Sequence, residues 1–270
     1  MSNKKISIII PVYNGKMFIK ILLDSILENV KYPNYEVIVV DDFSYENMDE
    51  VYNLYKDNSK IKIIYNRQNL GFAKSNNVAV SYSSGEYLYF TNSDTIILEN
   101  TIENIIFSYE NRIQLYGIEN IGAIQSKIIK PTENNNYVIQ TIGAIIDREK
   151  GLPKYFFPNI SIDDSRANRR MIIELFMGCG FFMPRDIWNE LEGFDENFGK
   201  YYLEDTDLAL RLREAGYLIG YEPTSVIVHF HGVSTTAYVK DQKEFDYNYQ
   251  KSLNYFFNKW PKDKILKVLK

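Results

Sequence analysis

The feature that most constrains the fold of this chain is a regular alternation of short apolar runs and longer helical patterns in its first half. Apolar, β-branched runs typical of strands cover residues 6–12, 37–40, 61–65 and 87–90. Helical patterns follow them over residues 17–28, 46–56, 73–81 and 101–109. This alternation predicts an α/β fold with a mostly parallel sheet. The runs show little polar alternation, as expected for strands covered by helices on both faces.

The second half predicts further strands, long loops and a tail. We expect a fifth strand near 121–129, helices at 185–191 and 205–215, and two more strands at 217–221 and 225–230. Residues 131–170 are polar and proline-containing, which predicts long loops with short strands. These loops could select a second substrate, or they could lie on the surface without a binding role. The predicted organisation is one domain over 1–235, with halves at 1–128 and 129–235, and a helical extension over 236–270.

Composition narrows the classes of function. The formal charge of -4 and a pI near 5.4 argue against binding of DNA or RNA through phosphates. The single cysteine, Cys179, allows no internal disulfide and fits a reducing compartment. The N-terminal apolar run is too short for a signal peptide, and no stretch is long enough to span a bilayer. We therefore expect a cytoplasmic location.

The last twenty residues are both basic and aromatic, and they allow two interpretations. Their lysines are Lys251, Lys259, Lys262, Lys264, Lys267 and Lys270, interleaved with Phe256, Phe257, Trp260, Ile265, Leu266 and Leu269. Such a segment can lie on an anionic membrane surface, which would place the protein peripherally at the inner face of the membrane. It can equally be a helix packed on the domain with a solvated basic face. The aromatic side chains also make a homodimer possible.

Polar side chains follow each of the first four predicted strands. They are Tyr13 and Asn14, Asp41 and Asp42, Asn66 and Arg67, and then Asn92, Ser93 and Asp94. Any one of these clusters could serve only the turn in which it lies. Because ligands of open α/β sheets bind outside the carboxyl ends of the strands, four such clusters predict a binding site at this edge.

Motifs that are absent indicate what kind of site this is. The chain has no G-x-G-x-x-G after a strand, no G-x-x-x-x-G-K-[ST] and no G-x-S-x-G. The sequence therefore contains none of the motifs that usually indicate dinucleotide redox chemistry, P-loop phosphate transfer or a serine nucleophile elbow. The interpretation that is left is a nucleotide-binding site formed by polar residues at separate strand ends and by acidic side chains.

Asp94 is the best candidate for a metal ligand, because a divalent ion on a diphosphate prefers carboxylate oxygens. His229 and His231 share one face of the last predicted strand, and either could add a ligand or simply satisfy a backbone partner.

A second acidic cluster, Glu204, Asp205 and Asp207, opens a predicted helix. Helix capping accounts for one acid at such a position but less well for three. Arg211 lies four residues after Asp207 and can pair with it, which leaves Glu204 and Asp205 for the cleft. An acid there can take a proton from an incoming hydroxyl, so the two acidic clusters together predict group transfer from a nucleotide.

These motifs, taken together, resemble family-two glycosyltransferases of the GT-A fold, closest to the bacterial rhamnosyltransferase-like members. The matching segments are residues 7–14, 36–44, 69–73 with Asn76 and Asn77, 193–195, 203–208, and His229 with Gly232 and Ser234. Their order and spacing cover the chain from residue 6 to about residue 234.

The resemblance implies a single GT-A domain, Rossmann-like with a mostly parallel sheet, whose first half binds a nucleotide sugar and whose second half binds the acceptor. It implies that Pro11, Tyr13 and Asp42 line the nucleobase pocket, and that Asn69, Gly71 and Asn77 surround the donor. The neighbouring motif residues Asn14, Asp41, Phe72, Asn92 and Ser93 belong to the same nucleotide-sugar site. Asp94 would hold Mg²⁺ or Mn²⁺ with His229, and Asp205 would be the catalytic base beside Glu204.

The sequence departs from the family pattern at Asn92, which stands where the family usually has the first aspartate of an acidic triplet. We therefore expect the activity to depend less strictly on a metal ion. The implied function is inverting transfer of a sugar from a UDP- or dTDP-sugar to a glycan or lipid-linked acceptor in cell-surface polysaccharide synthesis. A non-catalytic subunit that binds a sugar nucleotide or glycan is the main alternative. A nucleotidyltransferase is a third, but the glycine- and arginine-rich opening that would cradle a triphosphate is missing.

Overall fold

The computed structural model describes residues 3–134, 136–230 and 242–270. Its first half contains five strands, β1 (Ile6–Val12), β2 (Tyr35–Asp41), β3 (Ile61–Tyr65), β4 (Tyr87–Phe90) and the short β5 (Thr95–Ile97). The helices of this half are α1 (Lys16–Asn29), α2 (Asp49–Tyr52), α3 (Phe72–Ser81), α4 (Thr101–Glu110) and α5 (Arg112–Tyr116). The predicted strand–helix alternation of this half is therefore confirmed.

The second half combines several strands of three to five residues with the two longest strands and the longest helix of the described chain. Its strands are β6 (Ile121–Pro131), β7 (Tyr137–Thr141), β8 (Ala144–Ile146), β9 (Pro153–Tyr155), β10 (Met171–Ile173), β11 (Phe181–Pro184) and β12 (Leu218–His229). Its helices are the 3₁₀ turn η1 (Ser165–Ala167), α6 (Arg185–Glu190), α7 (Glu204–Glu214), α9 (Gln242–Lys259) and α10 (Lys262–Val268). The segment 131–170 thus holds short strands between loops, as its sequence predicts.

One large sheet organises the molecule, with the strand order β10-β12-β6-β11-β4-β1-β2-β3. Strands β3, β2, β1 and β4 are parallel neighbours, and β6 and β12 are parallel to each other. Strand β11 is antiparallel to both β4 and β6, so those two neighbours run in the same direction. The central strands are therefore mostly parallel around the reversed strand β11, while β10, β5 and β7 pair antiparallel at one side of the sheet. The carboxyl ends of β1, β2, β4 and β12 meet at one edge.

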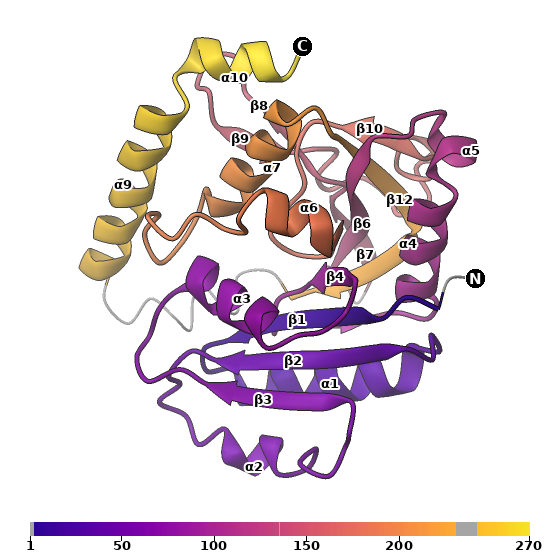
Figure 1. The fold of residues 1–270 in the computed structure, drawn as a ribbon, viewed down its shortest axis with the longest axis vertical. Coiled ribbons are helices and arrows are strands. Elements are labelled where there is room, and N and C mark those ends of the chain that lie inside the picture. The colour runs from indigo at the N-terminus through magenta and orange to yellow at the C-terminus, as the bar shows by residue number, and fades with distance from the viewer. Residues whose placement is uncertain (1–2, 135, 231–241) are drawn as a thin grey trace.

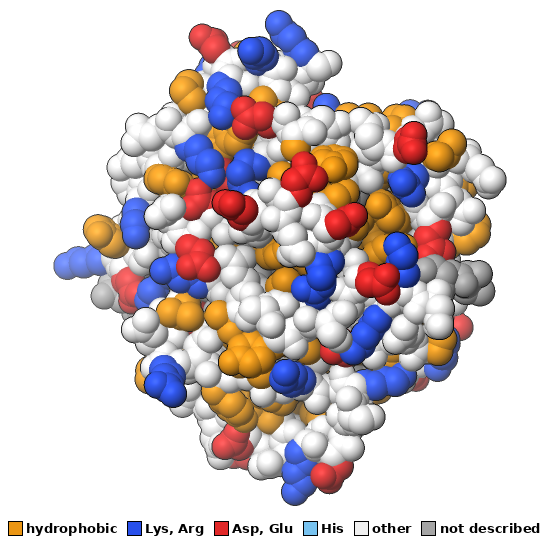
Figure 2. Space-filling view, in the orientation of Figure 1, with side chains coloured by type: hydrophobic (Ala, Val, Ile, Leu, Met, Phe, Trp, Pro, Cys, Tyr) orange, Lys and Arg blue, Asp and Glu red, His pale blue; other side chains and the backbone are white. Residues whose placement is uncertain are grey.

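Both faces of the sheet are covered, which explains the continuous apolar runs in the sequence. On β1, Ile8 and Ile10 face one buried cluster together with residues of α1 and α4, while Ile9 faces a second cluster with residues of α3 and α7. Figure 1 shows α3 in front of β1 and α1 behind β2. On the face drawn in Figure 2, basic and acidic side chains are interspersed, with hydrophobic side chains between them.

Two predicted elements differ from the structure for identifiable reasons. The helix expected at 46–56 is reduced to α2, because the Glu46 carboxylate accepts hydrogen bonds from the backbone N–H groups of Gly15 and Lys16 at the start of α1. The two strands expected at 217–221 and 225–230 form the single strand β12. Its pairing with β6 shifts register between Glu222 and Val226, a shift that accommodates Pro223, which has no backbone N–H to donate.

The C-terminal extension packs on the domain through its apolar side. Phe256, Trp260 and Ile265 are fully buried, so the packed-helix interpretation of this segment is correct for these residues. Figure 1 shows α9 and α10 along one side of the molecule, next to α7. Among the described residues, no helix has the length and apolar character needed to cross a bilayer.

Candidate functional site

A pocket opens at the carboxyl ends of β1, β2 and β4, and we call it the strand-end pocket. It has a volume of about 130 Å³. Its lining includes eight of the residues singled out from the sequence, namely Pro11, Tyr13, Asp42, Asn69, Gly71, Phe72, Asn92 and Ser93. Val12, Ser75, Lys200 and Tyr201 complete it. The structure thus brings together side chains from three strand ends and from the 69–72 segment that precedes α3.

Asp42 shapes one wall of this pocket. Its Oδ1 accepts hydrogen bonds from the backbone N–H of Leu70 and from Asn66 Nδ2, both at 2.8 Å, and its Oδ2 accepts one from the Gly71 N–H at 2.8 Å. Burial raises the pKa of the Asp42 carboxyl, and these hydrogen bonds oppose that shift. Asp42 therefore holds the 66–71 loop against the pocket.

Gly71 is required by the close approach of another segment. Its φ is +84°, and a Cβ placed there would lie 2.7 Å from the Cα of Lys200. The backbone carbonyl of Lys200 also accepts a hydrogen bond from the Phe72 N–H at 3.2 Å. Lys200 thereby lines the pocket, and its Nζ lies 2.7 Å from Glu244 Oε1 on α9.

The candidate metal ligands Asp94 and His229 are brought together, as expected from the resemblance. His229 Nε2 lies 3.2 Å from Asp94 Oδ1, and the backbone N–H of Phe230 donates to the Asp94 carbonyl at 3.0 Å. Gln140 Oε1 on β7 lies 3.2 Å from His229 Nδ1, so the imidazole is held on both sides. His231, Gly232 and Ser234 lie outside the described residues.

The donor atoms at this position fit a divalent cation. Asn92, which lines the strand-end pocket, has its Nδ2 3.5 Å from His229 Nε2, and its buried Oδ1 has no hydrogen-bond partner among the described residues. A carboxylate, an amide oxygen and an imidazole are ligands that Mn²⁺ and Mg²⁺ accept, and diphosphate oxygens can fill the remaining positions. Within the described chain, no group of three or more His, Cys, Asp or Glu residues forms a metal site.

Three of the singled-out residues make their side-chain hydrogen bonds away from the pocket lining. Asn14 Oδ1 accepts hydrogen bonds from the backbone of the 43–46 loop, at 2.9 Å for the Tyr45 N–H. The carboxylate of Asp41 accepts from the Ser44 N–H and the Tyr52 hydroxyl. Asn77 is paired with the backbone of Phe194 on the far side of α3. These side chains shape the loops behind the strand-end pocket.

Asp205 stands at the start of α7, where the chain enters the helix through two strained residues. Tyr202 and Leu203 have φ values of 68° and 72°, a region that non-glycine residues seldom adopt. Asp205 Oδ2 accepts a hydrogen bond from the Gly178 N–H at 2.8 Å, and its Oδ1 accepts one from the Thr206 N–H at 2.7 Å. Burial raises the pKa of the Asp205 carboxyl, while these hydrogen bonds oppose the rise. The result is an oriented carboxyl with increased basicity.

Glu204 differs from Asp205 in its surroundings. It is 6% exposed, and its Oε2 has no hydrogen-bond partner among the described residues. Burial and then the charge of Asp205 raise the pKa of Glu204 well above its ordinary value. Glu204 does not line the strand-end pocket or the cavity beside Asp205 described below. It is therefore a buried carboxyl next to Asp205, and its surroundings favour the protonated form.

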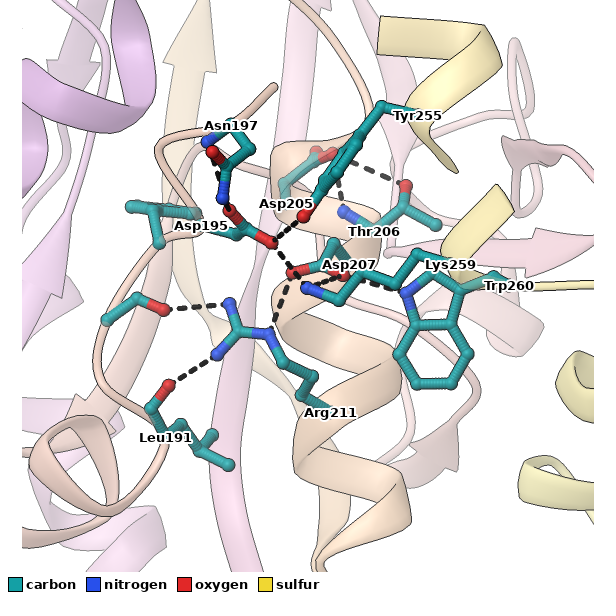
Figure 3. A network of polar contacts seen from close by, with 12 residues as sticks. Leu191, Asp195, Asn197, Asp205, Thr206, Asp207, Arg211, Tyr255, Lys259 and Trp260 are labelled. Atoms are coloured by element: carbon teal, nitrogen blue, oxygen red, sulfur yellow. Dashed lines mark hydrogen bonds and ion pairs between the residues drawn. The ribbon is translucent and has the colours of Figure 1, made fainter. Parts of the chain in front are cut away.

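Asp207 connects α7 to the C-terminal extension (Figure 3). Its Oδ2 accepts a hydrogen bond from Arg211 Nε at 2.7 Å, which is the pairing expected from the sequence. Its Oδ1 lies 2.8 Å from Lys259 Nζ and 2.7 Å from Trp260 Nε1. Lys259 also contacts Asp195 Oδ2 at 2.6 Å. Asp207 thus serves the packing of the helices rather than the cleft.

A second cavity, of about 440 Å³, lies beside Asp205, and we call it the α7 cavity. Its lining is mainly apolar and aromatic, with contributions from β8, β9, the start of α7 and the first turns of α9. The lining residues are Ala144, Leu152, Pro153, Lys154, Tyr155, Met177, Tyr202, Leu203, Asp205, Thr206, Phe245 and Tyr249. Its size lies within the usual range for ligand pockets, about 300–1,000 Å³.

Several site residues could not be identified from the sequence. Gln140, Tyr155 and Lys200 stand in segments without a recognisable motif, and their positions depend on the folding of the 131–170 and 195–203 loops. Gly178 did carry a signal, because it belongs to the glycine-containing run 178–180 that precedes β11. A Cβ at Gly178 would lie 3.3 Å from the side chain of Asp205.

The sequence has a clear family match. The model for "Glycosyl transferase family 2" matches residues 7–187. An Escherichia coli protein, UDP-Glc:alpha-D-GlcNAc-diphosphoundecaprenol beta-1,3-glucosyltransferase WfgD, is 31% identical over 179 residues. That alignment covers 61% of this chain and 68% of the E. coli protein.

Solved structures share the fold at low sequence identity. A crystal structure of GalNAc-T7 with UDP, GalNAc and Mn²⁺ superposes with a TM-score of 0.67 at 14% identity, covering 86% of this chain and 45% of that one. A crystal structure of S. aureus TarS residues 1-349 superposes with a TM-score of 0.58 at 18% identity, covering 94% of this chain and 72% of that one. These similarities agree with the GT-A fold expected from the sequence motifs.

Proposed function

This chain belongs to glycosyl transferase family 2, and from that premise we propose that it transfers a sugar from a UDP- or dTDP-sugar to a saccharide acceptor with inversion. The observation that carries the proposal is the position of Asp205, whose oriented, half-buried carboxyl lines the α7 cavity. The chemistry is an exchange of bonds at one carbon atom of the donor sugar.

In the proposed step an acceptor hydroxyl oxygen forms a bond to the anomeric carbon. The bond from that carbon to the diphosphate oxygen breaks, and its electron pair leaves with the diphosphate. Asp205 takes the hydroxyl proton, which requires its carboxylate form, and the raised pKa makes it a better base. Attack from the face opposite the diphosphate inverts the anomeric centre.

The strand-end pocket is the proposed donor site. Asp42 and Gly71 fix its wall, and Lys200, whose ammonium group pairs with Glu244, lines the pocket beside them. Asn92, Asp94 and His229 would hold Mg²⁺ or Mn²⁺, whose charge stabilises the developing negative charge on the diphosphate. The GalNAc-T7 structure, which contains UDP and Mn²⁺, supports this assignment by analogy of fold.

The α7 cavity is the proposed acceptor site, because Asp205 must reach the attacking hydroxyl. The E. coli relative is named for a diphosphoundecaprenol-linked sugar acceptor, which supports a lipid-linked acceptor here and a role in polysaccharide synthesis. Such an acceptor would place the protein at the inner face of the membrane. The exposed lysines Lys262, Lys267 and Lys270 are available for contact with anionic headgroups.

The test is release of nucleoside diphosphate from a panel of UDP- and dTDP-sugars in the presence of Mn²⁺. We expect one donor to be hydrolysed slowly without acceptor, and we expect Asp205→Asn to lower that rate by about 10²- to 10⁴-fold. Asp246→Asn, at an exposed position on α9, is the matched control and should keep the wild-type rate. Equal rates for wild type and Asp205→Asn would reject Asp205 as the base. Donor binding without release from any donor would favour the non-catalytic binding subunit.

A further inference from the structure

We propose that α9 completes the acceptor site with an aromatic wall that binds the apolar face of a saccharide ring. The aromatic wall consists of Tyr155, Tyr202, Phe245 and Tyr249, all of which line the α7 cavity together with Asp205. This inference rests on the proposed function, and it names the acceptor class and the chain segment that recognises it. Phe245 and Tyr249 lie outside residues 7–187, the part of the chain that matches the family model.

The members of the wall support one another through ring contacts. The rings of Tyr202 and Tyr249 meet edge to face at 5.7 Å, and those of Tyr202 and Phe245 do so at 5.9 Å. Phe245 and Tyr249 lie one helical turn apart on α9, with their ring planes within 5° of parallel. These three rings form an organised surface from two segments distant in sequence, and Tyr155 on β9 adds a third segment to the wall.

The wall and the base belong to one site. Asp205 and Thr206 line the same cavity, and the charge of Asp205 contributes to raising the pKa of Tyr155, after burial as the main cause. Tyr155 also hydrogen-bonds with Gln140, which contacts the imidazole of His229. A ring lying on the wall would thus have its hydroxyls near Asp205 and near the ligands of the proposed metal site.

The chemistry of the lining favours a saccharide over a lipid chain. A pyranose presents an apolar C–H face and a rim of hydroxyls, and a tyrosine presents an apolar ring with one hydroxyl, so the two surfaces match. The cavity has a carboxylate at one point and lies within the size range of small-ligand pockets. A hydrocarbon chain would have no hydroxyl to offer Asp205.

Tyr249 allows a clean test, because it is 37% exposed and its replacement removes little packing. Tyr247 on the same helix is 70% exposed and does not line the α7 cavity, so Tyr247→Ala is the matched control. The probes are the methyl glycosides of glucose, galactose, N-acetylglucosamine and rhamnose, each with UDP or dTDP present. Saturation-transfer difference NMR reports which glycoside ring protons contact the protein.

We expect saturation transfer from the protein to the ring protons of at least one glycoside, both for wild type and for Tyr247→Ala. Tyr249→Ala should weaken that binding by about threefold to tenfold, and Tyr249→Phe, which keeps the ring, should restore most of it. Absence of saturation transfer from wild type to any of the glycosides, or equal saturation transfer in Tyr249→Ala, would overturn the proposal. Donor hydrolysis by the same wild-type preparation tests the transferase activity separately, so hydrolysis without glycoside contact would reject only the aromatic wall.

Discussion

Trp260 Nε1 donates a hydrogen bond to Asp207 Oδ1 over 2.7 Å, and both side chains are fully buried. This hydrogen bond links the junction of α9 and α10 to α7, the helix whose first turn contains the proposed base Asp205. Lys259 adds an ion pair to the same oxygen atom. The C-terminal extension is therefore part of the support for Asp205, which lies two residues before Asp207.

Replacement of Trp260 by phenylalanine should destabilise the protein while keeping most of the packing. A hydrogen bond to a charged group contributes about 1.5–3 kcal/mol, and we expect a loss of that size in the free energy of unfolding. Urea denaturation measures it, with Tyr247→Phe on the exposed side of α9 as the control. Unchanged stability in Trp260→Phe would mean that Lys259 and Arg211 alone satisfy Asp207.

Glu204 should make stability depend on pH in a defined direction. Its pKa is raised on folding, so its favourable contribution is present at low pH and is lost as pH rises above 4.5, the ordinary value. The loss can reach about 1.4 kcal/mol per pH unit until the folded-state pKa is passed. Glu204→Gln, neutral at every pH, should unfold with a flatter pH profile, whereas Glu119→Gln at an exposed position should follow wild type. Parallel profiles for Glu204→Gln and wild type would contradict this prediction.

Gly71 and Gly117 are two positive-φ glycines that should tolerate alanine to different degrees, because Gly71 has a ψ of 177°, a region nearly restricted to glycine, whereas Gly117 has a ψ of 18° in the left-handed helical region. Both have positive φ, at +84° and +70°, but a Cβ would meet Lys200 Cα at 2.7 Å only in the first case and nothing within 4 Å in the second. Gly117→Ala should cost about 1–2 kcal/mol from strain alone. Gly71→Ala should cost more and should also weaken binding of UDP or dTDP, because the Lys200 segment must move. Equal costs for the two variants would argue against the close approach.

Asn92→Asp should tighten binding of Mn²⁺. The added carboxylate lies beside Asp94 and His229, and a new unit charge at short range contributes roughly 1–4 kcal/mol, which corresponds to about fivefold or more in affinity. Without metal, the variant should be less stable than wild type because two carboxylates repel, and Mn²⁺ should restore its stability. Electron paramagnetic resonance of Mn²⁺ in the presence of UDP measures the affinity, with Asn254→Asp on α9 as the control for charge. A wild-type affinity in Asn92→Asp would place the metal elsewhere.

The first half of the fold could be predicted because its strands are buried on both faces. In β1 and β2 nearly every residue is apolar and buried, which leaves a continuous signal in the sequence. Strand β11 gave no comparable signal, because it is four residues long and follows a glycine-containing turn. Its place between β4 and β6 depends on pairing with segments far away in the sequence.

The candidate site likewise contains some residues that the sequence could identify and others that it could not. Asp94, Asp205 and His229 could be identified from their positions at strand or helix ends. The aromatic wall could not, since Tyr155, Tyr202 and Phe245 meet only after three separate segments have packed. The basic and aromatic character of the C-terminal segment was visible in the sequence, but not which of its lysines would pair with buried carboxylates, as Lys259 does.

The position of β11 also affects how the chain can fold while it is being translated. Residues 181–184 fill the gap between β4 and β6, two strands that are translated much earlier. Until they emerge, the nascent sheet exposes an unpaired β4 edge, which is the kind of surface that captures other chains. A fragment ending after residue 128 would carry that exposed edge permanently, so it should aggregate rather than persist as a soluble nucleotide-binding module.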